Sequence, residues 1–114
     1  MKNIKKRTIA IILIIVIILT SFTYIQVRKH QASEKVMQYL TEEKGYEESD
    51  IKSLKSIYSF LGIPTYSVNV TFTNEPNIVY CYFSHHAKGQ FEYYDINDKS
   101  IPVKDLKNYD PNTE

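Results

Sequence analysis

The stretch from Ile9 to Val27 reads Ile-Ala-Ile-Ile-Leu-Ile-Ile-Val-Ile-Ile-Leu-Thr-Ser-Phe-Thr-Tyr-Ile-Gln-Val and contains no charged residue. Nineteen residues of α-helix extend for roughly 28 Å, which is close to the hydrocarbon thickness of a bilayer. The stretch therefore predicts a transmembrane anchor at residues 9–27, with the lipid bilayer as its partner. A basic tag at residues 1–8 precedes it, and a juxtamembrane segment at 28–32 follows it.

A secretory signal peptide has a similar plan, and the fully apolar core from Ile9 to Leu19 suits one. Two features favour a retained anchor: the apolar stretch continues to Val27, and no Ala-x-Ala-like cleavage site follows the core. Release of the protein after cleavage is the alternative.

Basic residues flank the apolar stretch unequally, with four before it (Lys2, Lys5, Lys6, Arg7) and two directly after it (Arg28, Lys29). By the positive-inside tendency, the N-terminus is cytoplasmic and the rest of the chain is extracytoplasmic. The expected location is the cell membrane, with a single pass.

The remainder of the chain is small and acidic. From Gln31 onward, eight Lys face thirteen Asp or Glu, a net charge of −5. A nucleic-acid partner is not expected, because binding phosphates needs a basic face. Cys81 is the only cysteine, so no intrachain disulfide can form.

A second helix is expected from Ser33, as N-cap, to Lys44, with Val36, Met37 and Leu40 on its apolar face. Gly45 then ends it. Alternatively, this helix runs on unbroken from the apolar stretch, since nothing between the two forbids helix.

Strand patterns follow at residues 51–60, 65–73, 78–84 and 90–96. The clearest is 65–73, where Tyr66, Val68, Val70 and Phe72 alternate with polar residues. Turns are expected at residues 74–77 and 85–89. The predicted fold class is α+β: an N-terminal transmembrane helix, then one helix packed on a three- to four-stranded antiparallel sheet at residues 33–98. Residues 99–114 are expected to form an irregular tail whose end frays.

The order of these pieces resembles an uncharacterised family of small proteins from Gram-positive bacteria, domain of unknown function 3139. The resemblance covers roughly residues 1–96. It rests on the anchor and on four short motifs: Lys44-Gly45-Tyr46, Asp50-Ile51-Lys52-Ser53, Tyr58-Ser59-Phe60-Leu61 and Asn74-Glu75-Pro76-Asn77. It implies a membrane-anchored bacterial protein and supplies neither an activity nor functional residues. The tail after Asn97 departs from the pattern.

Candidate catalytic chemistry is sparse. Cys81 and His85 are a Cys-His pair only if the chain bends sharply, because four residues of strand separate them by roughly 13 Å. His85 and His86 point to opposite faces of a strand and converge on a metal only in a turn. We therefore expect no catalytic residues, no metal and no cofactor.

Ten tyrosines are the most distinctive feature of the composition. Tyr80, Tyr82 and Tyr94 are expected to share the sheet face away from the helix, as a possible partner-binding face for an envelope protein or wall glycan. The sequence thus favours a non-enzymatic, membrane-anchored extracytoplasmic module that binds a partner or modulates an envelope process. Alternatives are a small envelope enzyme or metal-binding protein using His85, His86 or Cys81, and a secreted factor.

Overall fold

The computed structural model describes residues 5–62, 64–85, 87–97 and 99–111. A long helix, α1 (Lys6–Gln38), continues into a π-helical turn, η1 (Tyr39–Glu43), and a short 3-10 turn, η2 (Glu48–Asp50). Four strands follow: β1 (Ile51–Tyr58), β2 (Tyr66–Phe72), β3 (Glu75–Phe83) and β4 (Gln90–Asp95). A last 3-10 turn, η3 (Val103–Asp105), lies in the tail. The fold class is α+β, as predicted.

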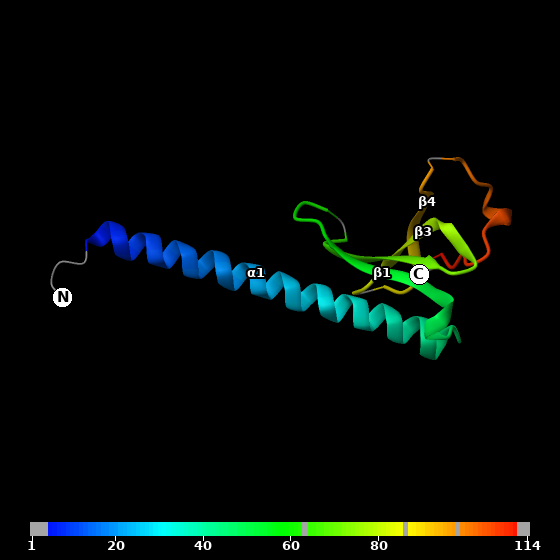
Figure 1. Cartoon of the computed structure of the whole chain (residues 1–114), viewed down its shortest axis with the longest axis horizontal. Coiled ribbons are helices and arrows are strands. Elements are labelled where there is room, and N and C mark those ends of the chain that lie inside the picture. Colours follow the sequence, from blue (N-terminus) through cyan, green and yellow to red (C-terminus); the bar gives the residue numbers. More distant parts are fainter. Residues whose placement is uncertain (1–4, 63, 86, 98, 112–114) are drawn as a thin grey trace.

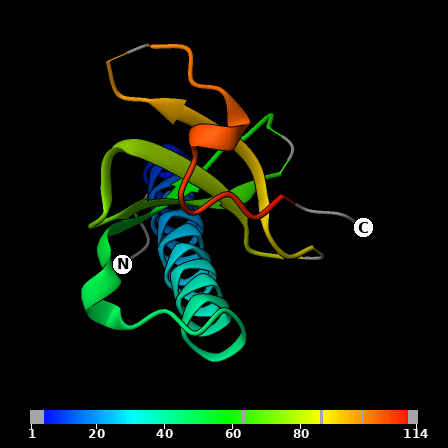
Figure 2. The same cartoon turned by 90° about the vertical axis from the view of Figure 1, so that its right-hand side faces the viewer.

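The strands form one antiparallel meander in the order β1-β2-β3-β4. Figure 1 shows the sheet packed on the C-terminal half of α1, while the N-terminal half extends beyond it. The molecule is accordingly elongated, with extents of 70 × 31 × 28 Å. Figure 2, viewed nearly along α1, shows the sheet lying to one side of the helix.

The expected helix beginning at Ser33 is not a separate element, and Ser33 is not an N-cap. The helix runs unbroken through residues 28–32, which was the alternative interpretation. Ser33 lies inside α1, and its Oγ contacts the Oγ of Ser56 on β1. Ser56 also donates a hydrogen bond to the carbonyl oxygen of Lys29 at 2.5 Å. The serines therefore join helix to sheet.

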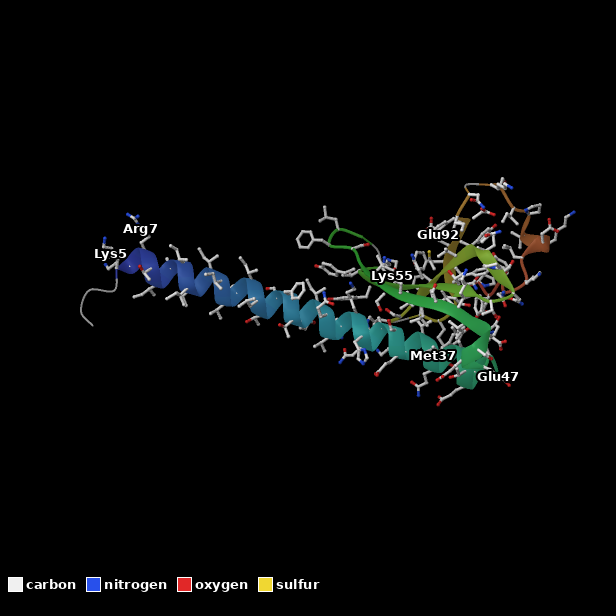
Figure 3. The ribbon with its side chains drawn as sticks, in the orientation of Figure 1. Lys5, Arg7, Met37, Glu47, Lys55 and Glu92 are labelled. Carbon is white, nitrogen blue, oxygen red and sulfur yellow. The ribbon has the colours of Figure 1, made fainter. Side chains whose placement is uncertain are left out.

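One stripe along α1 and η1 enters the core. Ala32, Val36 and Leu40 are spaced four residues apart and are almost fully buried, so they lie above one another on one helix face. They pack on the inner face of the sheet, formed by Tyr66, Val68, Val70, Phe72, Ile78, Tyr80 and Tyr82. Met37, labelled in Figure 3, was placed on the same stripe by the sequence but is only partly buried.

The helix ends at the predicted stop signal. Gly45 has φ of +78°, a left-handed conformation that L side chains rarely adopt. The backbone N–H of Tyr46 then donates to the carbonyl oxygen of Leu40 at 2.9 Å. The Tyr46 ring packs against Phe72, with ring centroids 4.8 Å apart, so the chain returns onto the sheet.

The turn expected at residues 74–77 is misplaced. Phe72 pairs with Glu75, so Thr73 and Asn74 alone form the β2–β3 turn, and Glu75 already belongs to β3. Pro76 lies on β3 between Glu75 and Tyr80, where the register with β2 is irregular. Its missing N–H therefore costs no ladder bond. Strand pairing has overridden local turn preference here.

Val70 is completely buried, whereas Thr71 points to the opposite face and is partly exposed. Val70→Ala should lower the free energy of unfolding by about 1–3 kcal/mol, because it removes two methyl groups and leaves a cavity. Chemical denaturation of the full chain in detergent micelles measures this. Thr71→Ala should change it by no more than about 0.5 kcal/mol. The register is wrong if Thr71→Ala is the more damaging change.

Candidate functional site

The aromatic residues are not distributed as the sequence suggested. Tyr80 and Tyr82 are buried in the core against α1, so their placement on an outer binding face is wrong. Tyr94 does lie on the outer face and is 45% exposed. Because β3 is apolar on both faces, its alternation alone did not show which face meets the helix. The three tyrosines therefore do not form one surface.

Exposed aromatic side chains gather instead along β4, which is an edge strand of the sheet. A groove of about 470 Å³ lies between β4, the end of β3 and the tail. We call it the β4 aromatic groove; its lining residues are Phe83, Gln90, Phe91, Glu92, Tyr93, Tyr109 and Pro111. Phe83 and Phe91 pack at 4.9 Å between ring centroids, and Tyr93 and Tyr109 at 5.7 Å. The groove can accept an apolar or aromatic group.

The tail that forms one wall of this groove is fixed to the sheet. The backbone N–H of Gln90 donates to the carbonyl oxygen of Asp110 at 2.8 Å, and the N–H of Asp110 donates to Oε1 of Gln90 at 2.9 Å. The expected fraying is therefore wrong for Asp110 and Pro111, while residues 112–114 lie outside the described residues. The first part of the β4 edge is covered by its own chain.

A buried polar network behind the groove centres on Asn108, which is 5% exposed. Its Nδ2 donates to Oε1 of Glu75 and to Oδ1 of Asn74, each at 2.8 Å, and its Oδ1 accepts from the hydroxyl of Tyr46 at 2.9 Å. Tyr80 donates its hydroxyl to the same Glu75 oxygen at 2.5 Å. Burial, and after it this hydrogen bond, raises the pKa of Tyr80, so the phenol stays protonated.

Asp110 links the tail to the end of the helix. Its Oδ2 accepts a hydrogen bond from the Tyr39 hydroxyl at 2.6 Å, and its Oδ1 is 3.2 Å from Nζ of Lys44. Burial first, and then the Asp110 hydrogen bond, raises the pKa of Tyr39. The tail thus joins the helix end to β4 and makes the groove part of the folded domain.

Cys81 and His85 are not brought together. Cys81 is buried on the outer face, where it pairs with Asn69 and Glu92. Burial raises the pKa of its thiol to about 11, so very little thiolate exists near neutral pH. Lys55 and Glu92 flank this face and are labelled in Figure 3. Cys81 has the environment of a small buried side chain rather than of an activated nucleophile.

His85 lies on the other side, near α1. Its Nδ1 is 3.0 Å from Nζ of Lys35, and its ring meets Tyr66 edge-on at 6.0 Å. His86 lies outside the described residues. Among residues that are described, no group of three or more His, Cys, Asp or Glu is arranged to hold a metal ion.

The N-terminal half of α1 is another exposed apolar surface. Its large side chains between Ile9 and Val27 are mostly about half exposed or more, and no described part of the protein covers them. Within the described residues, α1 with η1 is the one helix long and apolar enough to cross a membrane. An anchor and a signal sequence both have this form.

The structure thus defines a small α+β domain carried on one long apolar helix. A family model described as Protein of unknown function (DUF3139) matches residues 3–82, so the chain belongs to this family. The match ends within β3, and β4 and the tail lie beyond it. No curated protein and no solved structure matches the chain.

Sequence reasoning missed Asn108, Asp110, Phe91 and Tyr109. The tail carries no hydrophobic period, and its partners Glu75 and Gln90 are distant in sequence. The sequence shows aromatic residues concentrated at positions 91–94, but it does not show that this strand lies at an edge of the sheet.

Replacing Asn108 tests the network. Asn108→Ala should cost about 1–3 kcal/mol of unfolding free energy, because Oε1 of Glu75 and the hydroxyl of Tyr46 each lose a hydrogen-bond partner. Thermal or chemical unfolding of the full chain in micelles measures the loss. Lys104→Ala, at an exposed position of the same tail, is the matched control and should be close to neutral. Equal stability of both variants would show that the tail is not fixed by Asn108.

Proposed function

We propose that this protein is a single-pass, membrane-anchored module without enzymatic activity, whose extracytoplasmic domain binds a partner protein of the cell envelope. One observation carries the proposal: α1 is a single helix whose N-terminal half is apolar and uncovered, while its C-terminal half forms the core of the folded domain. A cleaved signal peptide does not usually continue as the core helix of the mature domain. This continuity favours a retained anchor.

The charge distribution supports the orientation. Basic residues begin α1, where Lys5 and Arg7 are labelled in Figure 3, and fewer follow the apolar stretch. The excess favours a cytoplasmic N-terminus. In the proposed orientation the domain is then outside the cell.

The β4 aromatic groove is the surface we assign to the partner. Partly exposed Phe and Tyr side chains supply large contact area with little loss of conformational freedom, and interfaces are enriched in them. The groove opens beside β4, whose edge beyond Gln90, where the tail pairs, can accept an extended peptide. A wall glycan, which also stacks on aromatic rings, is the alternative occupant.

The enzyme or metal alternative through His85, His86 and Cys81 has less support. It requires a nucleophile or ligand set, and the Cys81 thiol is buried and protonated near neutral pH. Release as a secreted factor remains the alternative to anchoring.

Orientation can be tested without knowledge of the partner. Protease added to intact protoplasts should digest residues 31–114 while an N-terminal epitope stays protected inside. Digestion only after lysis would contradict the orientation, and an intact mature form in the medium would contradict the anchor.

Partner binding can be tested by site-specific photo-crosslinking in living cells. A benzophenone amino acid at Phe91, inside the groove, should give a discrete adduct that mass spectrometry identifies as one envelope protein. The same probe at Lys55, exposed on β1, is the control and should give none. An adduct removed by wall hydrolases would replace the protein partner by a glycan. The absence of any adduct specific to Phe91 would overturn the assignment of the groove.

A further inference from the structure

Two adjacent apolar side chains are exposed at the turn between β1 and β2. Phe60 is 79% exposed and Leu61 is 90% exposed, which exceeds every large apolar side chain of the uncovered half of α1. Nothing in the described part of the chain packs on them. Two adjacent exposed apolar residues at one turn form a small apolar patch rather than scattered surface hydrophobics.

The turn points back along α1 toward its apolar half. Figure 1 shows the green turn projecting from the domain in that direction, and in Figure 3 it stands clear of the rest of the sheet. A groove of about 490 Å³ separates it from the helix at the level of Arg28, one residue beyond the apolar stretch. The turn is thus level with the end of the apolar stretch without packing on it.

The register supports the same placement. Ser56 is hydrogen-bonded to Lys29, which fixes β1 relative to α1 at that level. Four more residues of extended chain reach at most about 13 Å further, which corresponds to about nine residues of helix. The turn that carries Phe60 and Leu61 can therefore lie up to about nine helical residues beyond Lys29, on the side of the apolar stretch.

Aromatic and basic residues mark that level. The tilted rings of Tyr58 and Tyr66 pack at 5.2 Å between centroids, and the Arg28 guanidinium lies 5.4 Å from the centroid of the Tyr66 ring. Tyrosine and basic side chains are enriched where protein meets the headgroup layer. The turn extends from this level toward the apolar half of α1 (Figure 1).

We propose that the β1–β2 turn is a second membrane contact, in which Phe60 and Leu61 enter the interfacial layer of the same bilayer that α1 crosses. This inference rests on the proposed anchoring. Only side chains need to leave water, because the backbone can stay in the hydrated headgroup layer. The turn also bonds internally: Ser59 N–H donates to the Thr65 carbonyl at 2.8 Å, and Gly62 N–H to the Ser59 carbonyl at 3.2 Å.

The chain contains no tryptophan, so a single introduced tryptophan reports on its own position. Three full-chain variants, Phe60→Trp, Phe22→Trp and Tyr94→Trp, are reconstituted in vesicles of phosphatidylcholine and phosphatidylglycerol. Phe22 lies in the apolar stretch, and Tyr94 lies on the outer face of β4. Replacement of exposed Phe60 should leave the fold intact, which circular dichroism verifies.

We expect Phe60→Trp to emit at shorter wavelength than Tyr94→Trp and to lose intensity with lipids brominated near the top of the acyl chain. Phe22→Trp should also be quenched, and Tyr94→Trp should not. If position 22 is quenched but position 60 behaves like position 94, the second contact is overturned and the anchor stands. If position 22 is not quenched, the anchor itself fails. Quenching at all three positions would mean that the whole domain lies on the membrane and would also overturn a specific turn contact.

Discussion

The structure depends on the packing of one helical stripe against one sheet face. Ala32, Val36 and Leu40 are the helical contribution, and Val70 lies at the centre of the strand contribution. The inner face of the sheet is removed from water by α1, and the helix gains tertiary stability only from the half that packs on the sheet. The shared core therefore holds the two halves of the chain together. With no disulfide available, hydrophobic burial and the polar tail network carry the stability.

The tail network complements this core from the other end. Asn108 and Gln90 bring the last part of the chain onto the sheet through hydrogen bonds, whereas the helix does so through apolar contact. Buried polar groups of this kind give a single arrangement when each has a partner. The β4 aromatic groove has a defined shape because its tail wall is fixed in this way.

Local patterns were sufficient for most of the architecture. The strict alternation from Tyr66 to Phe72 predicted the central strand and its buried face, and Gly45 predicted the helix end, because both signals are local. Tyr80 and Tyr82 were misplaced because both faces of β3 are apolar, so only contact with α1 distinguishes them. Ser33 satisfied the rule for a cap, but an unbroken helix leaves no free N–H groups there to cap. The groove depends on pairings between the tail and β4, which no local pattern encodes.

The continuity of α1 has a mechanical consequence. A flexible linker would let the domain move and turn freely. An unbroken helix instead fixes both the distance of the domain from the uncovered half of α1 and its rotation about the helix axis. Each residue inserted between the uncovered half and Ala32 would lift the domain by about 1.5 Å and turn it by about 100° about the helix axis. The number of residues in this segment therefore determines the rotation of the domain about the helix axis. In the proposed anchored state, it sets which side of the sheet faces a given neighbour in the plane of the membrane.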